Sequence, residues 1–166
     1  IILSLFVALT GCNDWLDVSP KADMKAEDLF GTEAGFRDAL VGVYALMCGT
    51  NSYGRDLTYG YLDVLAQYYN SPLKTTSSGY EHNFKNAAEY KYTEKTEESR
   101  ISSIWSNHFS AVANINQAML FIDENKGVFT SPEVHDVYKG EFLALRAILH
   151  FDILRLFAPS AARNNN

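Results

Sequence analysis

Two pairs of adjacent carboxylates are the first residues in this sequence that could do chemistry. Glu97-Glu98 and Asp123-Glu124 each place two acids side by side. Glycoside hydrolysis needs two carboxyl groups facing each other across about 5 to 9 Å, one of them with a raised pKa. Adjacent residues do not face each other in this way, so we expect no catalytic role. Acids in a first helical turn favour the helix dipole; we therefore expect Glu97-Glu98 to be solvated at a helix start and Asp123-Glu124 to occupy a turn.

The histidines and cysteines show no metal-binding pattern. No two histidines have the i, i+4 spacing of a helical metal motif, and neither Cys12 nor Cys48 accompanies them. Two cysteines are also too few for a disulfide scaffold. We expect no metal site, no cofactor and no enzyme activity, and a surface or core position for each histidine: His82, His108, His135 and His150.

Two further motifs favour structural roles. Glu141 and Arg146 lie five residues apart and do not share a helix face, so ion pairs with other helices are expected. A second motif repeats at helical spacing and is expected to be core: Ile101, Trp105, Val112 and Ile115.

Aromatic residues in the segment 70–93 are the best candidates for binding a ligand. Helical periodicity stops there, and Ser, Thr, Asn and Gly are mixed with aromatic rings. Long loops in compact domains are often functional. Rings presented by a polar loop can stack on sugars while neighbouring polar groups bind hydroxyls. The candidates are Tyr80, His82, Phe84 and Tyr90; the alternative is that they pin the loop to the helices, and Tyr68 and Tyr69 are expected to pack.

Four helices are expected to carry this loop. Apolar residues recur at helical spacing, and no segment alternates long enough to predict a strand. The expected helices begin after a cap at Thr32, at Arg55, after Thr96 and after a cap at Ser131, and they end near Gly49, Tyr69, Asn125 and Pro159. The prediction is an all-α fold of antiparallel helix pairs with one long loop at about 70–93.

The first twelve residues favour an export signal. Residues 1–11 are uncharged and mostly apolar, and this run is too short to span a bilayer. Leu9-Thr10-Gly11-Cys12 resembles the lipobox of bacterial lipoproteins, in which the cysteine is acylated and becomes the mature N-terminus. Residues 1–11 are thus expected to be part of a signal peptide, and 12–21 a lipidated tether. The alternative is an ordinary core segment with an incidental cysteine.

Size and charge fit a single domain that does not bind nucleic acid. The chain has 166 residues, and we expect 22–166 to form one helical domain cut short at its end. The chain has a formal net charge of -6, and its Lys and Arg residues form no basic stripe in the sequence. Both observations argue against binding to the phosphates of a nucleic acid.

Several segments, taken in order, resemble the start of a SusD/RagB-type outer-membrane lipoprotein. The longest is the helix 139–159, similar to the Glu-x-x-x-x-Arg-Ala-x-x-x-Phe helix of that family and its proline-ended exit. The other matching segments are Trp15-Leu16-Asp17, Ser19-Pro20, 28–36, 40–44 and 62–69.

This resemblance implies tetratricopeptide-like helix pairs and a non-catalytic function in polysaccharide utilisation. Such a lipoprotein would be anchored on the outer face of the outer membrane through Cys12, where it would bind a glycan and deliver it to a TonB-dependent, SusC-like transporter. The alternative is a lipid-anchored helical-repeat scaffold that binds protein partners.

Overall fold

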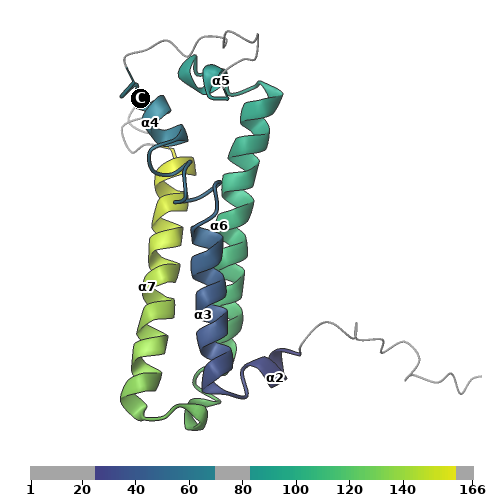
Figure 1. The fold of residues 1–166 in the computed structure, drawn as a ribbon, viewed down its shortest axis with the longest axis vertical. Coiled ribbons are helices and arrows are strands. Elements are labelled where there is room, and N and C mark those ends of the chain that lie inside the picture. The colour runs from purple at the N-terminus through teal and green to yellow at the C-terminus, as the bar shows by residue number, and fades with distance from the viewer. Residues whose placement is uncertain (1–24, 70–82, 160–166) are drawn as a thin grey trace, which may run out of the picture.

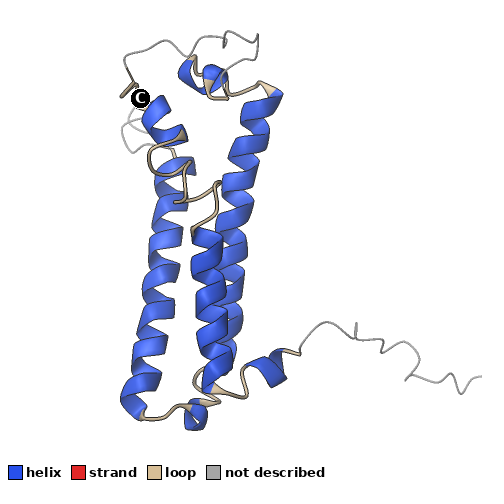
Figure 2. Ribbon diagram, viewed as in Figure 1, coloured by secondary structure: helices blue, strands red, loops and turns tan. Residues whose placement is uncertain are grey.

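The computed structural model describes residues 25–69 and 83–159, which form an all-helical bundle (Figures 1 and 2). No strand occurs in these two ranges, as predicted. The expected signal peptide, tether and acylated Cys12 lie outside the described residues. The helices are α2 (Ala26–Leu29), α3 (Glu33–Met47), α4 (Tyr61–Leu65), α5 (Lys85–Ala88), α6 (Lys95–Phe121), the 3-10 helix η3 (Lys126–Val128) and α7 (Pro132–Phe157).

Three long helices form the body of the molecule. Figure 1 shows α6 running antiparallel to both α3 and α7, and most contacts between helices join α6 to these two. The short helices α4 and α5 lie where α6 begins and α7 ends, which we call the upper end; α2 and η3 lie at the opposite, lower end. The predicted antiparallel pairs are thus present.

Two of the predicted helix starts are confirmed by their capping bonds. The Thr32 hydroxyl accepts a hydrogen bond from the Gly35 N–H at 3.1 Å, and the Ser131 hydroxyl accepts one from the Val134 N–H at 3.4 Å. Pro132 occupies the first position of α7, where its missing N–H costs nothing.

The start of α6 differs by two residues. Its cap is Glu94, without a side-chain bond, instead of Thr96. Thr96 lies within the first turn, where its hydroxyl accepts a hydrogen bond from the Asn86 amide at 3.1 Å. Contact with another segment has therefore replaced the local cap.

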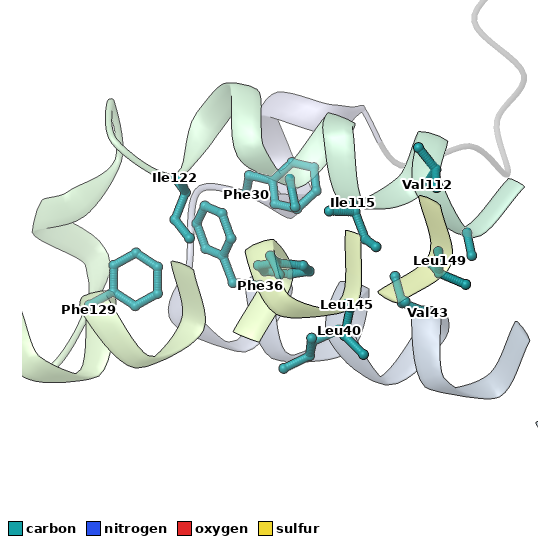
Figure 3. Packing of buried hydrophobic residues seen from close by; sticks show 13 residues of the cluster. Phe30, Phe36, Leu40, Val43, Val112, Ile115, Ile122, Phe129, Leu145 and Leu149 are labelled. Atoms are coloured by element: carbon teal, nitrogen blue, oxygen red, sulfur yellow. The ribbon is translucent and has the colours of Figure 1, made fainter. Parts of the chain in front are cut away.

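The main core is a cluster of apolar side chains between α3, α6 and α7. Phe36, Ile115 and Phe142 have no exposed surface. Aromatic rings close the lower end, where Phe36 lies 5.0 Å from Phe30 and 4.9 Å from Phe129 between ring centroids (Figure 3). Burial of large apolar side chains is the main favourable contribution to folding of this region.

One residue of the predicted core stripe is not in the core. Val112 and Ile115 are buried, but the Trp105 side chain is 43% exposed. Its ring lies on the flank of α6, 4.6 Å from Phe109 and 4.9 Å from Phe157. Helical spacing predicts which residues share a broad face but does not separate its centre from its edge.

The predicted helix over 55–69 is wrong for most of its length. Only Tyr61–Leu65 is helical, and 50–60 forms a series of turns. At Gly60 a side chain would lie 2.8 Å from the Arg55 carbonyl oxygen, so this turn requires glycine. The turns bury Asp56 completely, which a regular amphipathic helix would have exposed.

The predicted loop also contains structure that the sequence pattern missed. Helix α5 lies within 70–93, while residues 70–82 are outside the described part of the chain. A second, smaller apolar cluster joins α4, α5 and the start of α6 through Tyr61, Val64, Ala87 and Ile104. The upper end therefore has its own core.

Candidate functional site

Of the four predicted ligand-binding residues, Phe84 and Tyr90 are described, whereas Tyr80 and His82 lie outside the described residues. Phe84 is half-buried, and the Arg100 guanidinium lies 4.5 Å from its ring centroid. Tyr90 is 48% exposed. Both residues belong to the upper end, but only Tyr90 presents much of its ring to solvent.

Tyr90 is part of a group of exposed tyrosines at the upper end, which we call the tyrosine surface. Tyr69 donates a hydrogen bond to the Tyr59 carbonyl oxygen, and the rings of Tyr90 and Tyr92 lie 6.2 Å apart. The prediction that Tyr68 and Tyr69 pack is wrong, since both are exposed, Tyr68 at 77%. The tyrosine surface consists of Tyr59, Tyr68, Tyr69, Tyr90 and Tyr92.

Two helix ends beside this surface adopt an uncommon conformation. Gln67 follows α4 with a φ of 59°, and Tyr90 follows α5 with a φ of 54°. Both turns close in the same way, with the Gln67 N–H bound to the Val64 carbonyl and the Tyr90 N–H to the Ala87 carbonyl, each at 3.0 Å. A left-handed conformation costs a bulky residue on the order of 1 kcal/mol and persists where its surroundings over-determine it.

Each of these residues also caps the other helix. The Gln67 side-chain amide donates a hydrogen bond to the Ala88 carbonyl at 3.2 Å, and the Tyr90 hydroxyl donates one to the Leu65 carbonyl at 2.9 Å. Leu65 and Ala88 end α4 and α5, and terminal carbonyls have no partner within their own helix. This exchange ties the segment of Tyr68 to the segment of Tyr90.

A buried charge cluster joins the same segments to α6. Arg100 Nη1 donates a hydrogen bond to Asp56 Oδ2 at 3.3 Å, and Nη2 donates to both the main-chain and side-chain oxygens of Asn83 at 3.0 Å. Its Nε lies 3.7 Å from Glu97 Oε2. Asp56 and Glu97 have no exposed surface. One guanidinium thus connects the turns at 50–60, the start of α5 and the first turns of α6.

Glu97 was expected to be solvated and is instead buried, because the turns at 50–60 and α5 cover the start of α6. It has the ion contact with Arg100 but no hydrogen bond. Burial raises the pKa of Glu97. The Arg100 charge lowers this pKa and the Asp56 charge raises it, and the net shift is upward. Burial and the charge of Glu97 also raise the pKa of Tyr61 to about 12.

An apolar cavity of about 360 Å³ opens beside the tyrosine surface. It lies between α4, α6 and α7, and Tyr92 belongs to both its wall and the tyrosine surface. Apolar walls next to polar tips of aromatic rings are common in ligand sites. The other main lining residues are Tyr61, Leu65, Ile104, Leu156 and Phe157.

Glu141 and Arg146 contact other helices as predicted, but neither forms the predicted ion pair with a residue of 25–69 or 83–159. Glu141 accepts a hydrogen bond from the Tyr44 hydroxyl at 2.5 Å, and Arg146 donates one to the Asn116 side chain at 3.1 Å. Both partners are neutral. The two residues therefore brace α7 against α3 and α6 without an opposite charge.

The described histidines do not come together as a metal site. His108 is buried, with Nδ1 2.9 Å from the Ile104 carbonyl oxygen, and His135 lies at the lower end between Asp123 and Asp136. Asp123 also pairs with Lys139. Within 25–69 and 83–159, no group of three or more His, Cys, Asp or Glu side chains could hold a metal ion.

The chain matches no protein-family model, no curated protein and no solved structure. Among the described helices, none is both long enough and apolar enough to cross a membrane. The tyrosine surface, with the cluster that positions it, is thus the candidate site on the strength of its own residues.

Proposed function

We propose that this chain is a lipid-anchored, surface-exposed glycan-binding protein that captures nutrient polysaccharide and delivers it to a TonB-dependent, SusC-like transporter of the outer membrane. The resemblance of its sequence segments to SusD/RagB lipoproteins supports this proposal, and its helical fold agrees with it. No bond of the glycan is made or broken in this function.

The tyrosine surface is the observation that carries the proposal. Aromatic faces stack on the apolar faces of sugar rings. The hydroxyls of Tyr59, Tyr69 and Tyr90 donate to main-chain carbonyls, and these bonds hold the rings in place. The surface gathers five such rings on segments that are tied together by Gln67 and Tyr90. Rings that are already positioned lose little conformational freedom when a ligand binds.

A second candidate function is a lipid-anchored helical scaffold that binds protein partners. The observation that favours it is the exposed apolar side chains on α7, among them Phe151 at 56% and Leu154 at 60%. Large apolar patches on a protein surface mark interaction sites. If the chain binds protein partners instead of glycans, it should show no glycan affinity, or an affinity that substitutions in the tyrosine surface do not change.

Calorimetric titration with a panel of soluble polysaccharides tests the proposed ligand class. Tyr68→Ala, Tyr90→Ala and Tyr80→Ala should each weaken binding of the preferred glycan about three- to tenfold, since a stacked ring contributes about 1 kcal/mol. Leu120→Ala removes an equally exposed apolar side chain from the other end of α6 and is the control. Unchanged affinity in both Tyr68→Ala and Tyr90→Ala would exclude the tyrosine surface as the glycan site, and unchanged affinity in Tyr80→Ala would remove Tyr80 from the candidates.

Cell fractionation tests the anchor. Cys12→Ala should move the protein from the membrane fraction to a soluble fraction, because stable attachment needs two or more acyl chains. In intact cells, protease should remove the wild-type protein, and a large transporter should copurify with it. Membrane-bound Cys12→Ala protein would contradict the lipid anchor.

A further inference from the structure

Helix α7 carries an apolar face on the side that points away from the bundle. Val137, Phe151 and Leu154 are 64%, 56% and 60% exposed. The small residues Gly140, Ala144 and Ala147 lie between Val137 and Phe151 on the same side, and all of these residues are exposed. We call this set the outer seam: Val137, Gly140, Ala144, Ala147, Phe151 and Leu154.

The outer seam has the spacing of a helix that packs on a second helix. Its members are separated by three and four residues in strict alternation, which is the heptad pattern of paired helices. The opposite side of α7 is already used, because Phe142, Leu145 and Leu149 pack into the main core. The helix is therefore apolar on two sides, and only one of them has a partner within the described chain.

Gly140 supplies a separate argument for a partner. A glycine within a helix costs about 1 kcal/mol relative to alanine. A Cβ atom added at Gly140 would meet no atom within 4 Å, so the packing of the described chain does not require glycine there. The close approach of another backbone or a large side chain would explain it.

The outer seam is complementary to itself in the antiparallel direction. Rotation about a two-fold axis midway between Leu145 and Arg146 pairs Gly140 with Phe151 of a second copy, and Val137 with Leu154. Ala144 then meets Ala147 at the centre. Each large ring thus faces the site that lacks a side chain, which is the match that an interface between identical copies requires.

The exposed charges along α7 also favour antiparallel pairing of the two helices. The start of α7 is acidic, with Glu133 and Asp136 exposed, and its end carries the exposed Arg155. Antiparallel pairing places Asp136 of one copy at the level of Arg155 of the other, whereas parallel pairing would bring the acidic ends together. The helix dipoles also favour the antiparallel arrangement.

We propose that two copies of this chain associate through the outer seam as a symmetric antiparallel dimer of α7 helices. Phe151 is the main anchor on each side of the centre, and it packs over Gly140 of the second copy. This dimer does not depend on the proposed glycan-binding function, because the tyrosine surface lies on the segments that flank α4 and α5 and not on α7.

Sedimentation of the full chain tests the proposal. The wild-type chain should dimerise reversibly between about 1 and 100 µM, the range of a modest interface. Gly140→Trp should weaken the dimer about tenfold or more, because it fills the space that Phe151 occupies. Gly42→Trp, which places the same ring at an open helical glycine of α3, is the matched control and should dimerise with the wild-type dissociation constant. Thermal unfolding should confirm that both variants fold, since both positions are open. A wild-type monomer over the whole range, or equal dimerisation of Gly140→Trp, would overturn the proposal.

Cross-linking tests the direction. In a chain with Cys12→Ser and Cys48→Ser, an equimolar mixture of Gly140→Cys and Phe151→Cys proteins should form a covalent dimer on oxidation. Each variant alone should form far less, because disulfides require Cα atoms within about 7 Å. Equally efficient cross-linking of Gly140→Cys alone would indicate parallel pairing and contradict the antiparallel model of the dimer.

Discussion

The body of the bundle and its upper end are stabilised in different ways. Around Phe36 and Phe142, three long helices meet through apolar side chains. At the upper end, Arg100 joins the turns at 50–60 to α6, and the paired caps of Gln67 and Tyr90 join the short helices α4 and α5 to each other. Long helices present enough apolar surface to stabilise one another, but short ones do not. At the upper end, specific polar contacts therefore add to a smaller apolar cluster, and together they hold an irregular surface.

This comparison predicts that damage to the body is global and damage to the upper end is local. The largest effect is expected for Phe142→Ala, which removes a fully buried ring from the main core. The free energy of unfolding should fall by about 3–5 kcal/mol, because transfer and cavity contributions add. Chemical denaturation should show one cooperative transition shifted to lower denaturant. Leu143→Ala is the control, because the neighbouring Leu143 side chain is 39% exposed, and it should change the free energy of unfolding far less. Equal destabilisation by the two variants would show that Phe142 is not part of the main core.

Arg100→Met should have the next largest effect, about 3 kcal/mol, because it leaves buried Glu97 without the Arg100 cation. Asp56 also loses its contact with Arg100 and keeps the contact with Arg55, whose Nε lies 2.7 Å from its carboxylate. Hydrogen exchange should show lost protection in 50–65 and 83–100, with the body of α3 and α7 still protected. Arg37→Met removes a guanidinium whose pair with Asp38 is exposed, and it should change stability little. Uniform loss of protection along the chain would show that the two regions do not unfold separately.

Glu97→Gln should have the smallest effect, and its sign should be opposite. Burial raises the pKa of Glu97, so the folded state favours its neutral form. At pH 7 the glutamine variant should be more stable than wild type by on the order of 1 kcal/mol, because it buries no unbonded charge.

The pH dependence of Glu97→Gln follows from the same shift. The stability that protonated Glu97 contributes is complete below the ordinary value of 4.5 and is lost as the pH rises through the raised pKa. Thermal unfolding of both proteins from pH 4 to 7 should therefore show the advantage of the variant appearing as pH rises. An advantage that stays constant, or a loss at pH 7, would show that the Arg100 contact outweighs burial.

The parts of the fold that could be predicted are those with strong local signals. Thr32 and Ser131 are good capping residues, and the apolar spacing behind each continues for several turns. Two of the long helices were predicted almost to the residue for this reason. Apolar spacing over 55–69 was misleading, because Gly54 and Gly60 allow close backbone contacts that no helical pattern encodes.

The candidate site was predicted in region but not in detail. Tyr90 is exposed as a binding residue would have to be, but Phe84 lies under Arg100. Tyr59, Tyr68 and Tyr69 were missed because the segment 55–69 was expected to be a packed helix, and Tyr92 was not chosen although it lies in the predicted loop. Burial of Glu97 also has no local signal, since it depends on Asp56 and Asn83, which are distant in sequence. A high local density of tyrosine between 53 and 92 was the signal that could have located the site.

The length of α6 has a consequence for where the proposed ligand would be captured. A helix of 27 residues is about 40 Å long, and α2, where the described chain begins, lies at the opposite end of α6 from the tyrosine surface (Figure 1). If the chain is anchored through Cys12 as proposed, the helical bundle can separate the tyrosine surface from the membrane. The tyrosine surface can then stand up to about 40 Å farther from the lipid than the foot of the bundle, within reach of long polymers that cannot approach the membrane itself.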